Sequence, residues 1–275
     1  MPHGISLPVN KPIIITFLAM EKVILLCTTK TRHGKKGSQA TGFFSKKNSS
    51  SWLNTCNTPQ FFLNFVIQIF PLIMIKNLLF DLGGVICNIQ RTRCVDAFEA
   101  MGWNDIASYL GDAAQKGFFM DLEKGLITPA EFRNQVRQHI ANPAATDSDI
   151  DNAFCRFIVG IPETRLQQLE LLRRKYKIYM LSNTNPIMWN SVLASEFEKL
   201  PGKKREDYFD GIVTSFEEHC AKPEPVIFER VIEKFGIKPE ETIFFDDAIQ
   251  NCHASAQLGF NWRHVKPENE FFNLI

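Results

Sequence analysis

Short apolar runs alternate with helical segments along residues 74–275, and this alternation constrains the fold more than any other feature. Each run has the length and composition of a buried strand. A strand pattern interrupted by helices predicts a doubly wound parallel α/β sheet with helices covering its faces. The expected strands are Lys76–Asp81, Lys177–Ser182, Ile212–Ser215, Thr242–Asp246 and Asn261–Val265. The expected core helices are Pro162–Tyr176, Lys222–Phe235 and Asp247–Leu258.

Residues 91–160 interrupt the alternation, because amphipathic segments follow one another there without strand signals. One of these segments begins at Thr128-Pro129-Ala130-Glu131. This sequence combines a capping box with proline at the first helical position. We therefore expect a helical cap at 91–160, inserted into an α/β core formed by 74–90 and 161–275.

Polar residues collect at the ends of the predicted strands, where open parallel sheets bind their ligands. They are Asp81 after the first strand, Ser182 and Asn183 at the second, Lys222 after the third, and Asp246 and Asp247 at the fourth. A carboxylate nucleophile, hydroxyl and amide donors and a cation are the groups that phosphoryl transfer needs. Clustered carboxylates would repel a phosphate, so a hard divalent cation, magnesium above all, is the expected cofactor.

Four sequence motifs occur in this order: FDLGGV (80–85), LSNTN (181–185), AKPEP (221–225) and FFDDAIQN (244–251). The set resembles the motifs of the haloacid dehalogenase superfamily. More narrowly, it resembles the helically capped branch that contains bacterial α-D-glucose-1-phosphate phosphatases. The resemblance covers about 74–275 and none of 1–73.

The resemblance implies a role for each motif residue. Asp81 would attack phosphorus and form an aspartyl-phosphate. Magnesium would be held by Asp81, Asp247 and the backbone carbonyl of Gly83. Ser182 and Asn183 would hydrogen-bond the phosphoryl oxygens. Lys222 would pair with both the phosphate and Asp81. Asp246 and Asn251 would be polar neighbours of the metal ligands. The implied reaction is hydrolysis of a small phosphorylated metabolite such as a hexose phosphate.

Gly83 departs from the family pattern, because most phosphatases of this superfamily have an acid two residues after the nucleophile. General acid–base catalysis typically contributes about 10²–10⁴-fold. We favour an active phosphatase in which another group replaces this acid. Asp121 and Glu123 of the cap are candidates, and a solvent-exposed helix end is their other interpretation. The alternatives are a phosphate-binding protein without turnover and a metal-free 2-haloacid dehalogenase.

Residues 1–73 differ from the rest, with eight Lys or Arg residues against one acid, although the whole chain carries a formal charge of only +1. They contain two interrupted apolar stretches, 13–27 and 61–75, neither of which matches a bilayer-spanning helix. We interpret 1–73 as a non-native or disordered leader, either translated upstream sequence before a start at Met74 or an extension without a folded role, and a membrane anchor is the alternative interpretation. The seven cysteines form no C-x-x-C pair, which favours reduced thiols in a cytoplasmic protein. Neither a nucleic acid nor a membrane is an expected partner, and the oligomeric state is not predicted.

Overall fold

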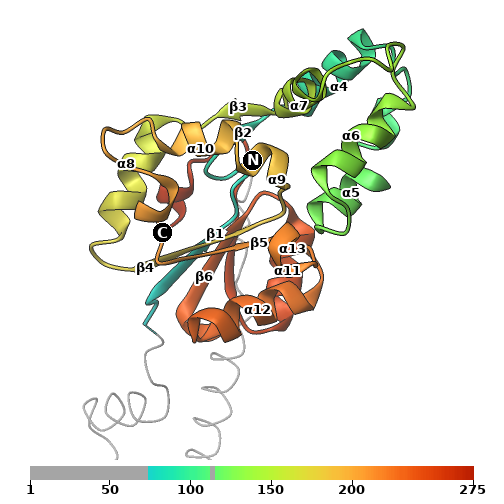
Figure 1. Cartoon of the computed structure of the whole chain (residues 1–275). Helices are drawn as coiled ribbons and strands as arrows, with labels where there is room; N and C mark the ends of the chain where they lie inside the picture. The colour runs from blue at the N-terminus through green and yellow to red at the C-terminus, as the bar shows by residue number, and fades with distance from the viewer. Residues whose placement is uncertain (1–73, 112–114) are drawn as a thin grey trace, which may run out of the picture. The chain divides into compact units, whose positions relative to one another are not determined.

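The computed structural model describes residues 74–111 and 115–275 (Figure 1). The expectations for 1–73, the proposed leader with its apolar stretches, lie outside the described residues. Within the described ranges, none of the helices is long and apolar enough to cross a lipid bilayer.

A five-stranded parallel sheet forms the core, in the order β5-β4-β1-β6-β7. Its strands are β1 (Asn77–Phe80), β4 (Lys177–Ser182), β5 (Gly211–Thr214), β6 (Thr242–Asp246) and β7 (Asn261–His264). The predicted doubly wound α/β fold is confirmed. Strand β1 lies in the middle, because Phe80 pairs with Met180 of β4 on one side and with Phe245 of β6 on the other.

Helices cover both faces of this sheet. Neighbouring residues of β1 point to opposite faces, and each packs against a different set of helices. Leu78 and Phe80 join a cluster that includes residues of α8 (Glu163–Leu172) and α10 (Val192–Phe197). Leu79 joins a second cluster, with residues of α12 (Pro225–Phe235). Figure 1 shows α12 and α13 (Ile249–Gln257) on the side of the sheet opposite α8. Two buried faces explain why the strands read as continuous apolar runs.

The cap consists of helices packed around an aromatic core. Its elements are α4 (Arg91–Ala100), a short 3₁₀ turn (Ile106–Ser108), α5 (Phe118–Glu123), α6 (Pro129–Arg137) and α7 (Asp147–Cys155). The rings of Phe119 and Phe132 meet edge to face at 4.9 Å, and Phe119 meets Phe154 at 5.2 Å. Thr128 caps α6 in a capping box with Glu131, as predicted.

Two differences between the structure and the predicted elements concern the cap and the position of Lys222. The block 91–160 is not helical throughout, because Ile158–Gly160 forms β3, which pairs antiparallel with β2 (Asn88–Ile89). These two short strands connect the cap to the core. The helix expected from Lys222 begins at Pro225, and residues 221–224 form a turn that leaves Lys222 at the sheet edge.

Candidate active site

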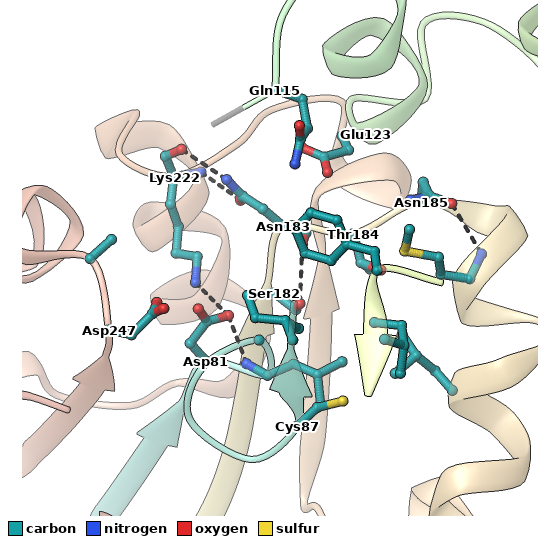
Figure 2. Close-up of a pocket in the computed structure, with 18 of the residues that line it drawn as sticks. Asp81, Cys87, Gln115, Glu123, Ser182, Asn183, Thr184, Asn185, Lys222 and Asp247 are labelled. Carbon is teal, nitrogen blue, oxygen red and sulfur yellow. Dashed lines mark hydrogen bonds and ion pairs between the residues drawn. The ribbon is translucent and has the colours of Figure 1, made fainter. Parts of the chain in front are cut away.

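The carboxyl ends of three neighbouring strands bring the predicted polar residues together (Figure 2). Asp81 follows β1, and its backbone N–H donates to the carbonyl of Phe245 in β6 at 2.9 Å. Ser182 ends β4 and Asp246 ends β6. Because β1 lies between β4 and β6, motifs about 100 residues apart in sequence meet at one edge of the sheet.

Lys222 connects two of the acidic residues. Its Nζ lies 2.7 Å from Asp81 Oδ1 and 2.8 Å from Asp246 Oδ2, and only 1% of its side chain is exposed. Burial disfavours the charged ammonium, but Asp246 and Asp81 outweigh this effect and raise the pKa of Lys222. Lys222 is therefore a permanent cation at neutral pH, as a partner of phosphate must be.

Asp246 is the anchor behind this cluster. It is fully buried and accepts hydrogen bonds from the Ala248 N–H at 2.8 Å and from Asn251 Nδ2 at 3.0 and 3.1 Å. Asn251 is thus placed against Asp246. These bonds and the Lys222 contact leave Asp246 well satisfied as a carboxylate.

Asp81 is held on one side only. Its Oδ1 accepts from the Leu82 N–H at 2.7 Å and contacts Lys222, whereas Oδ2 receives no hydrogen bond from the described residues. Burial raises the pKa of Asp81 to about 8, Lys222 opposes this shift, and the charges of Asp246 and Asp247 add to it. Negative charge here therefore needs another cation beside it.

Three carboxylates at this edge have the spacing of a metal site. Asp81, Asp246 and Asp247 each offer an oxygen, and these oxygens all lie within 4.8 Å of one another. Burial, and next the charge of Asp246, raise the pKa of Asp247. One ammonium does not neutralise three carboxylates, and an all-oxygen donor set suits a hard divalent cation such as Mg²⁺.

The two glycines after Asp81 have different structural constraints. Gly84 has φ +72°, and a Cβ there would lie 2.1 Å from Asp247 Oδ2, so only glycine lets Asp247 approach. A Cβ on Gly83 would meet nothing closer than Ile89 Cδ1 at 3.5 Å. The backbone would therefore accommodate a side chain at the position where the expected acid is missing.

The second motif supplies the donor side of the site. Ser182 is 1% exposed and its hydroxyl makes a long contact, 3.4 Å, to the Asn183 carbonyl. The Asn183 carboxamide accepts from the Lys222 N–H and donates to the Lys222 carbonyl, each at 2.9 Å. Asn183 therefore fixes the turn that carries Lys222, and one N–H of its amide remains for a ligand. The sequence interpretation had assigned this amide to phosphate alone.

The cap closes the cavity from the other side. The space above Asp81 measures about 120 Å³, and Glu123, Gln115 and Phe154 are among the cap residues that line it. Glu123 is only 8% exposed, which contradicts the interpretation of its helix end as solvent-exposed. Asp121 is half-buried and does not line the cavity.

Sequence reasoning assigned no role to three residues with amide or hydroxyl side chains that line the cavity: Gln115, Thr184 and Asn185. Asn185 caps α9 (Pro186–Trp189) through a 3.0 Å bond from the Met188 N–H, and its Nδ2 is buried without a hydrogen-bond partner. The Asn-Pro step predicts the cap. No pattern in the sequence would have placed Gln115 at the cavity.

The chain is similar to several known proteins. A D-ribitol-5-phosphate phosphatase of Bacteroides thetaiotaomicron is 36% identical, over 71% of this chain and 93% of the relative. A sesquiterpene phosphatase of Aspergillus oryzae is 28% identical, over 69% of this chain and 89% of the relative. A crystal structure of a HAD-family enzyme of B. thetaiotaomicron, an aspartate-to-alanine variant in complex with magnesium and inorganic phosphate, is also similar. It has a TM-score of 0.69 and 42% identity, and covers 73% of this chain and 98% of that one.

The family profile matches most of the described part of the chain. The haloacid dehalogenase-like hydrolase profile covers residues 75–259, which include every strand-end residue described above and the cap residues that line the cavity. The resemblance seen in the four motifs is thereby confirmed at the level of the family, and the narrower glucose-1-phosphate branch stays a prediction. This chain belongs to the haloacid dehalogenase-like hydrolase family.

Proposed function

We propose that this protein is a magnesium-dependent phosphatase that hydrolyses a small phosphomonoester through an aspartyl-phosphate on Asp81. The observation that carries the proposal is the buried contact of Lys222 with Asp81 beside two further carboxylates. This contact supports the proposal because a nucleophile, a fixed cation and metal ligands would then act at one point, with hydroxyl and amide donors beside them. The relative that acts on D-ribitol 5-phosphate supports the same reaction class.

In the first half-reaction the Asp81 carboxylate forms a bond to phosphorus as the bond to the ester oxygen breaks, and the leaving oxygen takes its proton from a water molecule in the cavity. Lys222, with Ser182 and the free N–H of Asn183, would hold the phosphoryl oxygens. Asp81, Asp247 and the Gly83 carbonyl would bind magnesium, which would offset the negative charge on the phosphoryl group. In the second half-reaction water attacks phosphorus, releasing inorganic phosphate and regenerating Asp81.

The substrate we propose is a sugar or polyol phosphate of modest size. A cavity of about 120 Å³ is somewhat smaller than the ~150 Å³ of a protein cavity that binds benzene. Such a space admits a phosphoryl group and the adjoining carbons of a small metabolite. D-Ribitol 5-phosphate, the substrate of a similar phosphatase, is the first compound to test, and hexose phosphates come next.

The test is phosphate release by the full chain from ribitol 5-phosphate, glucose 1-phosphate and p-nitrophenyl phosphate, with magnesium or with a chelator. Asp81→Asn removes the nucleophile, and Asp121→Asn, which changes an acid outside the cavity, is the matched control. We expect turnover that needs magnesium, disappears in Asp81→Asn and persists in Asp121→Asn. Folded protein that binds magnesium and inorganic phosphate but releases no phosphate from any of the esters would refute the phosphatase proposal and favour a binding protein.

A further inference from the structure

Glu123 is a buried acid that the reaction described above does not use. It is 8% exposed, it lines the cavity, and the structure records no hydrogen bond to its carboxyl group among the described residues. Among the residues that the structure describes, the other two buried acids, Asp81 and Asp246, both have partners. Buried polar groups in native proteins are almost always paired, so an unpaired one at a cavity wall indicates a ligand contact.

The chain directly after Glu123 is fixed to the core. A Cβ on Gly125 would lie 2.2 Å from the Phe216 carbonyl oxygen, so the two backbones are in close contact. The Lys124 carbonyl lies 3.1 Å from His219 Nδ1, and Lys124 Nζ lies 2.5 Å from Glu224 Oε1. These contacts hold the end of α5 against the core and keep Glu123 at the cavity.

Gln115 is the second unpaired polar group on this wall. Its Oε1 is buried without a hydrogen-bond partner. The backbone around it is anchored by a bridge between Leu110 and Gln115 and by a 2.8 Å bond from the Lys116 N–H to the Tyr109 carbonyl. Figure 2 shows Gln115 and Glu123 on the cap side of the cavity, beyond Asn183 as seen from Asp81. They therefore lie where the organic part of a phosphate ester would extend.

Burial favours the neutral, protonated form of Glu123. Burial raises its pKa to about 8, and Lys222 only partly offsets the shift. A neutral carboxyl group both donates and accepts hydrogen bonds, and so does a glutamine amide. Hydroxyl groups, which also do both, are the partners that two such groups match.

We propose that Glu123 and Gln115 form a hydroxyl-binding subsite for the leaving group, which makes Glu123 the residue that selects polyhydroxylated phosphate esters over apolar ones. The inference rests on the proposed function and deepens it. An apolar ester would leave both groups buried and unpaired, so the site rejects it even where its shape fits. Glu123 acts by binding the substrate in this account, and the bond-breaking steps remain with Asp81 and its neighbours.

Two substrates of similar length and different polarity test the proposal: ribitol 5-phosphate and pentyl phosphate. In Glu123→Ala we expect kcat/KM for ribitol 5-phosphate to fall about ten- to hundredfold, the cost of an unmade hydrogen bond. The value for pentyl phosphate should not fall and should rise, because the variant no longer leaves a buried carboxyl group unpaired beside the apolar chain. Glu123→Gln, which keeps a neutral hydrogen-bonding group, should retain most of the preference. Asp121→Ala, two residues away on the same helix and outside the cavity, is the matched control.

A binding measurement separates this inference from the proposed function. The single variant Asp81→Asn and the double variant Asp81→Asn/Glu123→Ala are each titrated with ribitol 5-phosphate and with inorganic phosphate. We expect Glu123→Ala to weaken ribitol 5-phosphate about tenfold or more and to leave inorganic phosphate unchanged. Equal loss for both ligands, equal loss of activity on both esters, or no loss at all would overturn the hydroxyl-binding role. Failure of the wild-type protein to turn over any ester would refute only the phosphatase proposal, because the titration still decides the role of Glu123.

Discussion

Replacing Gly84 by alanine tests the geometry of the metal site without removing any ligand. The residue has φ +72°, a region that costs a non-glycine residue about 1–2 kcal/mol. The added Cβ would also lie 2.1 Å from Asp247 Oδ2 and 2.5 Å from its Cγ, distances that no real contact tolerates. The Asp247 carboxylate must therefore shift from its present position beside Asp81 and Asp246.

The expected result has two parts. Backbone strain and the displaced side chain should lower the free energy of unfolding by about 1–3 kcal/mol in the absence of metal. Disturbing a metal ligand should weaken magnesium binding at least as much as loss of a supporting contact does, about 10–100-fold. Urea denaturation measures the first effect, and calorimetric titration with magnesium measures the second.

Gly83→Ala is the matched control, one residue earlier in the same turn. Its Cβ would meet only the Ile89 side chain, at 3.5 Å, an ordinary van der Waals contact. We expect the free energy of unfolding to change by less than about 1 kcal/mol, and magnesium affinity to stay as in the wild-type protein. If Gly84→Ala binds magnesium as tightly as Gly83→Ala does, the metal site does not depend on the approach of Asp247 to this turn, and the reasoning is refuted.

Three further predictions concern charge in and around the cavity. Lys222→Met leaves the carboxylates of Asp81 and Asp246 without their cation, so urea denaturation should show a loss of about 3–5 kcal/mol, and an unchanged stability would contradict the ion-pair assignment. Gly83→Asp restores an acid at the position where the family usually has one. The kcat for ribitol 5-phosphate should then rise by up to about 10²-fold. A folded variant with unchanged kcat would show that proton transfer does not limit the rate. The raised pKa of Glu123, about 8 against 4.5, means that the folded state keeps a proton which the unfolded state loses. The contribution of Glu123 to the free energy of unfolding therefore falls as pH rises from about 4.5 to about 8, by up to 1.4 kcal/mol per pH unit. Urea denaturation should show that the stabilities of wild type and Glu123→Gln depend differently on pH over that range. The same pH dependence in both proteins would show that Glu123 is exposed to water.

The core could be read from the sequence because local and global signals agree there. Each strand of the sheet is a short apolar run that ends in a polar cluster, and each prediction overlaps the observed strand. The capping box at Thr128 could also be predicted, because it depends only on two side chains three residues apart. The order of strands in the sheet was not predicted, since it depends on contacts between distant segments.

The cap shows where sequence reasoning fails. The strands β2 and β3 are two and three residues long, too short to show a periodic pattern, and they form only because each has the other as a partner. Glu123 ends a short helix, a place where charged residues are usually solvated. Glu123 is buried where the end of α5 contacts the core, with Gly125 close to the Phe216 carbonyl, and no local pattern encodes this contact.

The central claim is that Asp81 becomes phosphorylated during turnover. The direct measurement is acid quenching of the full chain during hydrolysis of ribitol 5-phosphate with magnesium, followed by mass spectrometry of the peptide that contains residue 81. We predict one phosphoryl group on Asp81 in the wild-type protein and none in Asp81→Asn, which should also release no phosphate. Phosphate release that persists in Asp81→Asn, or a covalent phosphoryl group on any other residue, would contradict the account.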